Sequence, residues 1–171
     1  MSTFGYVIKT PYDLLQKAER ELSRFNDQDF FEGDGNELAD HALNCAISLW
    51  HMVDWLWRSD NPRFKTALTA LGVNSFEELH SYVRKQCFAL DVCFELATGA
   101  KHFKLVQRSK ATRTPLIADT RASITSVVEL HHTFSHVLKI ALVDGQELMA
   151  AEVLMDAVEY WRQFLSTNGL K

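Results

Sequence analysis

Apolar residues recur every three or four positions through the first hundred residues, the period of helices that bury one face. The first such stripe follows a helix start signal. Thr10 can cap a helix, Pro11 suits its first position, and Asp13 stands where the acid of a capping box belongs. We therefore predict a first helix from about residue 10. Its apolar stripe consists of Leu14, Leu15, Ala18, Leu22 and Phe25.

A second helix is predicted from the pair Asp34 and Glu37, which form another capping signal, to about Ser59. This segment is apolar on more than one side, a pattern typical of a helix at the centre of a bundle. We expect its residues to dominate the core, together with two residues of a later helix. The predicted core residues are Leu49, Trp50, Val53, Leu56, Leu90 and Phe94.

Two more starts follow. Asn61-Pro62 begins a short helix that Gly72 ends, and Ser75 with Glu78 forms a third capping pair. The helical pattern then continues without proline or glycine until Gly99. One long helix and two helices broken near Cys87 both fit this stretch.

The pattern changes after Gly99. Residues 105–123 are polar and basic and predict a loop, whereas Val127–Val143 alternates like a strand. Asp144-Gly145 is typical of a two-residue hairpin turn, which gives a β element over 124–150 before a last helix over 151–166. The whole chain, 1–171, reads as a single domain. We predict a mainly α, α+β fold: a bundle of about five helices over 10–104 with a small antiparallel β-hairpin near the C-terminus.

Composition narrows the class of protein. No apolar run reaches the ~18 residues that suggest a membrane span, and the N-terminus lacks the cationic and apolar segments of a secretory signal. The three cysteines match no zinc or disulfide spacing. We therefore expect a cytoplasmic protein without a membrane partner.

The net charge of −4 is unevenly distributed. The window 101–121 carries six cations and one acid, so it has a net charge of +5 and leaves −9 for the rest of the chain. Such segregation favours contact with phosphates or nucleic acid, although a solvated loop fits it too. The cations are Lys101, Lys104, Arg108, Lys110, Arg113 and Arg121.

Polar residues also form stripes within the predicted central helices. One stripe contains Asn44, Ser48 and His51, with Asp40, His41 and Asp54 one turn away; another contains Asp91, Glu95, Thr98 and His102. If the two helices face each other, a polar pocket forms between them. The hypothesis is that five residues converge there. They are His51, Asp54, Asp91, Glu95 and His102.

Two other interpretations of these stripes stay open. Buried polar groups often bond only to one another, and a catalytic or metal site is the third reading. His-Glu-x-x-His and a Gly-rich phosphate loop are both missing from the sequence. We therefore predict no metal ligands, and the sequence indicates no particular cofactor.

The stretch Phe94–Lys104, with its Lys-His-Phe segment, resembles the corresponding helix end of HEPN domains. The resemblance covers about the first two-thirds of the chain. It implies a helical bundle that binds nucleotides or RNA, in a family with many dimeric ribonucleases of toxin–antitoxin and phage-defence systems. The whole chain also resembles small uncharacterised bacterial proteins in which such a segment is followed by a hairpin and a helix.

The sequence departs from the ribonuclease motif of that family, an Arg followed by a His five to seven positions later. His102 matches the His, but the positions five to seven before it hold Ala97, Leu96 and Glu95. The group that would stabilise phosphate charge is therefore missing. The resemblance implies a non-catalytic module that binds RNA, a nucleotide or a protein in bacterial or phage conflict, with a homodimer as one possible state.

Two alternatives remain. One is a hydrolase or nuclease that uses His102 with Asp91 or Glu95, either with or without a metal ion; the other is a purely structural partner protein. In the binding reading, the contacts come from the basic window and the first polar stripe. These candidates are His51, Asp54, Lys101, Lys104, Arg108, Lys110 and Arg113.

Overall fold

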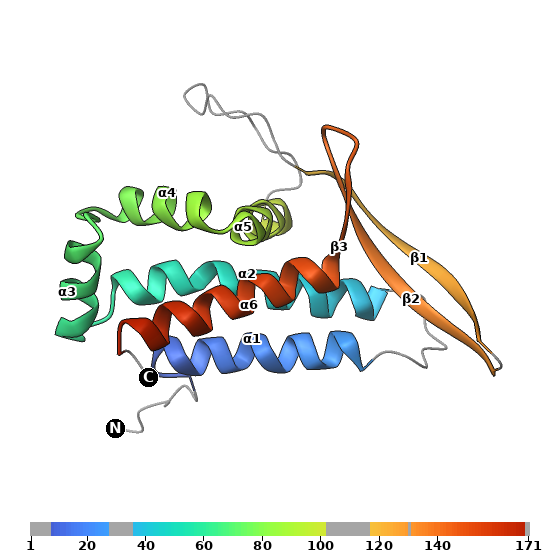
Figure 1. Cartoon of the computed structure of the whole chain (residues 1–171), viewed down its shortest axis with the longest axis horizontal. Helices are drawn as coiled ribbons and strands as arrows, with labels where there is room; N and C mark the ends of the chain where they lie inside the picture. Colours follow the sequence, from blue (N-terminus) through green and yellow to red (C-terminus); the bar gives the residue numbers. More distant parts are fainter. Residues whose placement is uncertain (1–7, 28–35, 102–116, 130, 170–171) are drawn as a thin grey trace.

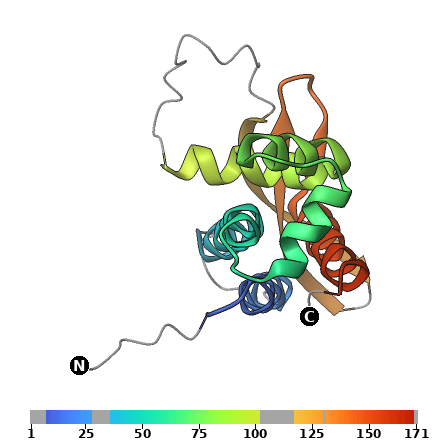
Figure 2. The same ribbon diagram turned by 90° about the vertical axis from the view of Figure 1, so that its left-hand side faces the viewer.

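The computed structural model describes residues 8–27, 36–101, 117–129 and 131–169. Over 118–129 and 131–136, the description is limited to the backbone. Six helices and three strands lie within these ranges, and Figures 1 and 2 show them from two perpendicular directions. The prediction of a mainly helical α+β fold with a small antiparallel element near the C-terminus is confirmed.

The first two helices pack along each other. Helix α1 (Pro11–Asn26) begins with the predicted capping box, in which Thr10 accepts from the Asp13 amide and the Asp13 carboxylate accepts from the Thr10 amide. Helix α2 (Asn36–Trp57) ends two residues before the predicted Ser59, and its predicted cap Asp34 lies outside the described residues. Figure 1 shows α2 between α1 on one side and α4 and α5 on the other.

Three shorter helices follow. Asn61 caps α3 (Pro62–Ala70), which ends before Gly72, a residue whose φ of +72° suits glycine. Ser75 and Glu78 form the predicted capping box of α4 (Phe76–Gln86). Cys87 is extended, with φ −137° and ψ 106°, so the stretch left open by the sequence is two helices, α4 and α5 (Phe88–Lys101).

The C-terminal helix α6 (Ala150–Thr167) closes the core against α1, α2 and α5. Trp161 is fully buried, and its indole Nε1 donates a hydrogen bond of 2.9 Å to the carbonyl of Leu49 at the centre of α2. Five of the six predicted core residues are buried, whereas Phe94 is half-buried and packs against the core from its edge.

The sheet differs from the prediction. It has the order β1 (Ile117–Glu129), β2 (His131–Leu142) and β3 (Glu147–Met149), with both pairings antiparallel. The predicted loop over 105–123 is wrong from residue 117 onward, and the single run Val127–Val143 is divided between two strands. The alternation of apolar and polar residues continues from the end of β1 into β2 because a single residue separates the two strands in the sequence, so it suggests one strand. The start of β1 is too polar to indicate a strand.

A hairpin at Asp144-Gly145 is confirmed, but its connection is longer than the predicted two residues, since residues 143–146 lie between β2 and β3. The Leu142 amide donates to the carbonyl of Gln146 at 2.8 Å, and Gly145 has a φ of +89°. Within the described ranges, no helix combines the length and apolar character needed to cross a bilayer.

Candidate functional site

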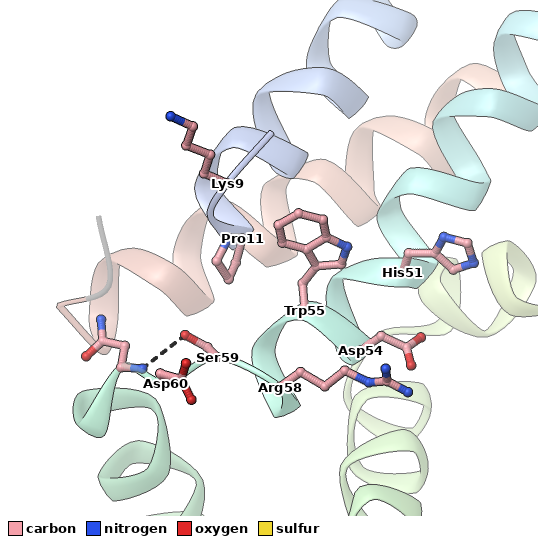
Figure 3. A pocket seen from close by; sticks show the side chains of 9 residues that line it. Lys9, Pro11, His51, Asp54, Trp55, Arg58, Ser59 and Asp60 are labelled. Carbon is pink, nitrogen blue, oxygen red and sulfur yellow. Dashed lines mark hydrogen bonds between the residues drawn. The ribbon is translucent and has the colours of Figure 1, made fainter. Parts of the chain in front are cut away.

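An open depression lies where the start of α1 meets the end of α2 and the turn into α3 (Figure 3). It is an open pocket of about 750 Å³. Its lining is mostly polar and includes one large aromatic ring. The lining residues are Lys9, Pro11, His51, Asp54, Trp55, Arg58, Ser59, Asp60 and Asn61.

Helix α2 supplies one wall of the pocket through a single stripe. His51, Trp55 and Arg58 stand at i, i+4 and i+7, so their side chains leave the helix on the same side. The opposite side of α2, with residues such as Val53 and Leu56, is buried in the core. Because the core fixes that side, the polar stripe faces outward, and His51 is exposed.

The other wall is held by hydrogen bonds at two helix starts. The Asp13 carboxylate accepts from the Lys9 amide at 3.0 Å, which fixes the chain entering α1; this bond is the main reason that the pKa of Asp13 lies below its ordinary value. In the turn before α3, the Asn61 amide donates to the Ser59 hydroxyl at 3.2 Å. The Asn61 side chain in turn accepts from the Arg63 amide at 3.0 Å.

The pocket combines a flat ring with charges of both signs. The Trp55 indole stands between Pro11 and His51, while Arg58 extends toward Asp54 and the Lys9 amine points outward (Figure 3). A half-buried indole offers a stacking surface, and the surrounding cations and carboxylates offer partners for polar groups. This arrangement suits a planar heterocycle that carries a charged substituent.

The remaining polar residues of the α2 stripe turn toward α1. The Lys17 amine donates to the Ser48 hydroxyl at 2.7 Å, and that hydroxyl donates to the Asn44 carbonyl at 2.7 Å. Asn44 itself is exposed. These bonds connect Ser48 to α1 and to the preceding turn of α2, so we assign Ser48 a structural role.

A second polar contact between α1 and α2 centres on Glu21. Its carboxylate lies 2.9 Å from Arg24 Nη1 and 3.2 Å from His41 Nδ1. Burial raises the pKa of Glu21, but the His41 hydrogen bond and the charges of Lys17 and Arg24 outweigh it and bring the pKa below its ordinary value. Asp40 is exposed on the same helix.

Asp91, predicted to face His51, pairs instead with the neighbouring helix. Its carboxylate accepts from Arg84 Nε at 2.5 Å, and the Arg84 guanidinium lies 4.1 Å from the ring centre of Phe94. Phe94 in turn meets Trp50 edge-on, with ring centres 4.8 Å apart. Asp91 is therefore fixed between α4 and α5 and does not line the pocket.

His80 is a half-buried polar residue that the sequence analysis did not single out. Its ring meets Trp50 at 4.7 Å and Phe76 at 4.4 Å, both edge-on. Within the described part of the chain, His80 Nε2 and Arg84 Nη2 are buried atoms without a hydrogen-bond partner. Burial lowers the pKa of His80; Asp54 and Glu77 oppose this shift, and Arg84 adds to it.

The structure thus divides the predicted site. His51 and Asp54 share the pocket, Asp91 belongs to the α4–α5 contact, and Glu95 is half-buried on α5 away from the pocket lining. Lys101 ends α5, and its side chain is not described. The backbone of Arg121 lies in β1, with its side chain also undescribed. The other predicted residues lie outside the described ranges: His102, Lys104, Arg108, Lys110 and Arg113.

Of the nine residues that line the pocket, the sequence analysis proposed only His51 and Asp54 for binding. It missed the other seven as pocket residues, among them Lys9, Trp55 and Arg58. A signal for two of them was present, since Trp55 and Arg58 continue the spacing that begins at His51. No group of three or more histidine, cysteine or acidic residues among the described positions is placed to hold a metal ion.

Comparison of the chain with protein-family models, with curated proteins and with solved structures finds no match.

Proposed function

We propose that this chain is a non-catalytic, HEPN-like binding module of the cytoplasm that takes a nucleotide, free or within RNA, into the pocket between α1 and α2. The role in bacterial or phage conflict follows from the family resemblance alone. The observation that carries the proposal is the Trp55 ring, which stands in an open pocket of about 750 Å³ beside His51 and Arg58.

A nucleobase fits the chemistry of this ring. Stacking of a base on an aromatic side chain contributes about 1–3 kcal/mol and tolerates different bases, because every base has a π face. Asn61 and Ser59, which line the same pocket, have hydrogen-bonding side chains of the kind that bind base edges. Arg58 and Lys9 provide cations for a phosphate, and the planar guanidinium of Arg58 suits two phosphate oxygens at once.

The placement of Asp91 supports a binding role over hydrolysis. A general base must reach the proton that it removes, but the Asp91 carboxylate is buried and engaged by Arg84. The Arg that the ribonuclease motif requires before His102 is also missing from the sequence. The alternative hydrolase therefore cannot use Asp91 as a free base, and it lacks the Arg that would stabilise phosphate charge.

The test is a titration of the full chain with AMP, GMP and short single-stranded RNA at low salt, followed by calorimetry or fluorescence polarisation. Trp55→Ala should weaken binding by about 1–3 kcal/mol, whereas Trp55→Phe should retain part of it. Tyr12→Ala is the matched control, because Tyr12 is an exposed aromatic of α1 that does not line this pocket.

Two results would overturn the proposal. One is the absence of binding to all three probes at low salt. The other is binding that Trp55→Ala and Arg58→Ala leave unchanged, which would place the nucleotide elsewhere, for example on the basic window. If RNA binds in this pocket, Arg58→Ala should reduce the slope of log affinity against log salt concentration by about 1, since one cation–phosphate contact is lost.

A further inference from the structure

Strand β1 forms one edge of the sheet over its whole length. The order β1-β2-β3 leaves β1 at one side and the three-residue β3 at the other. Within the described residues, β1 pairs with β2 alone. With 13 residues, β1 is well beyond the usual strand length of about 5–6 residues, so its outer side presents a long row of backbone donors and acceptors.

The sequence of β1 lacks most of the features that normally protect such an edge. Proteins shield edges with proline, with charges, with bulges or with short strands. In β1 the irregularity lies at its start, between Ile117 and Asp119, and the strand has no proline. Its middle, residues 122–128, is uncharged and reads Ala-Ser-Ile-Thr-Ser-Val-Val. Uncharged segments of this length and β propensity pair readily with another strand.

The β1–β2 ribbon also extends away from the helices. Figure 1 shows it running past the ends of α1 and α2, with the end of β1 and the start of β2 beyond the helical layers. A two-stranded ribbon is only marginally stable by itself, and additional strands or a helix are needed to support it. An added strand on the β1 side would supply that support.

We propose that this strand is β1 of a second copy of the chain, paired antiparallel about a two-fold axis at Thr125. The strand is self-complementary in this register. Arg121 of each copy stands opposite Glu129 of the other, which gives two opposite-charge pairs, and Ile124 stands opposite Ser126. A register centred on Ser123 instead sets Glu129 against Ile117 and leaves Arg121 without an acid.

The resulting dimer has one continuous sheet of the order β3-β2-β1-β1-β2-β3. The backbone groups at the centre of the sheet are then all paired, and neither copy retains a long free edge. An isologous contact of this kind closes at two chains, because each edge is used once. It does not depend on the nucleotide pocket, which lies at the opposite end of α2.

The test is the oligomeric state of the full chain by light scattering after size exclusion. We expect a dimer for the natural sequence. Arg121→Glu and Glu129→Arg each set like charges opposite one another at both pairs, so each should raise the dimer dissociation constant about tenfold or more. The double variant Arg121→Glu/Glu129→Arg should restore it.

A mixing experiment separates loss of pairing from loss of folding. Arg121→Glu and Glu129→Arg chains, each impaired alone, should form a heterodimer when mixed, because every pair then joins opposite charges. A monomeric natural chain would overturn the proposal. So would a dimer that tolerates both single variants, because its contact would then lie on another surface. Failure of the mixed variants to associate would exclude this register.

Discussion

Two interfaces of the bundle bury charged side chains, and they satisfy those charges to different degrees. Between α1 and α2, Glu21 accepts from Arg24 and contacts His41, and both partners reach water. Between α4 and its neighbours, Arg84 and His80 each retain a buried nitrogen without a partner among the described residues. The first interface has a partner in open contact with water, since the Arg24 side chain is 57% exposed, whereas the Arg84 side chain is only 20% exposed. Water therefore replaces a lost partner more readily at the first interface than at the second.

The largest effect that separates the interfaces should come from Asp91→Ala. This change leaves the Arg84 guanidinium largely buried without its carboxylate, and removing one partner of a buried pair costs about 3–5 kcal/mol. The free energy of unfolding measured with urea checks this value. The double variant Arg84→Met/Asp91→Leu is the control, because it removes both charges and should recover most of the loss. A loss under about 1 kcal/mol for Asp91→Ala would show that the interfaces do not differ.

Glu21→Ala should have a smaller effect at the other interface. The substitution removes a buried acceptor, but Arg24 has an exposed side chain and His41 is partly exposed, so both can turn to water. We expect a loss of about 1–3 kcal/mol in the same unfolding experiment. Arg24→Ala, at the exposed end of the pair, should cost less than about 1 kcal/mol. A loss at Glu21 that exceeds the loss at Asp91 would reverse the comparison.

The same two interfaces show how far sequence reasoning reached. Helix starts were predictable because Thr10, Asn61 and Ser75 act locally, through bonds to residues two or three positions away. The stripe of polar residues on α2 was also predictable from its period. Its partners were not, since a period defines a face of a helix but not which helix covers it. The face containing Ser48 meets α1, while His51 faces solvent.

His80 illustrates the limit most clearly. Its environment comes from Trp50 on α2, Phe76 one turn earlier on α4, and Arg84, whose position depends on Asp91 of α5. Phe76 and Arg84 stand one turn either side of His80 on its own helix, but the contact with Trp50 arises only in the fold and leaves no local pattern. The first part of β1, residues 117–123, was missed for the related reason that pairing with β2, rather than its own alternation, defines it.

The smallest expected effect is a dependence of stability on pH. It distinguishes the two interfaces by the pH range in which each loses stability. Burial keeps the pKa of His80 below its ordinary value of 6.5, so the unfolded chain takes up this proton before the folded chain does. The stabilisation from neutral His80 is therefore complete above pH 6.5 and declines as the pH falls below it. Glu21, whose pKa lies below 4.5, loses its contribution only as the pH falls below 4.5.

The measurement is the free energy of unfolding of the natural chain and of His80→Phe between pH 7.5 and pH 5, a window chosen to bracket the histidine value of about 6.5. Phenylalanine keeps a ring against Trp50 and Phe76 and removes the titrating group. The natural chain should lose stability toward pH 5 more steeply than His80→Phe, and the difference between the two curves isolates His80 from the other histidines. Parallel curves would show that His80 takes up its proton equally in the folded and unfolded states, which would contradict the prediction.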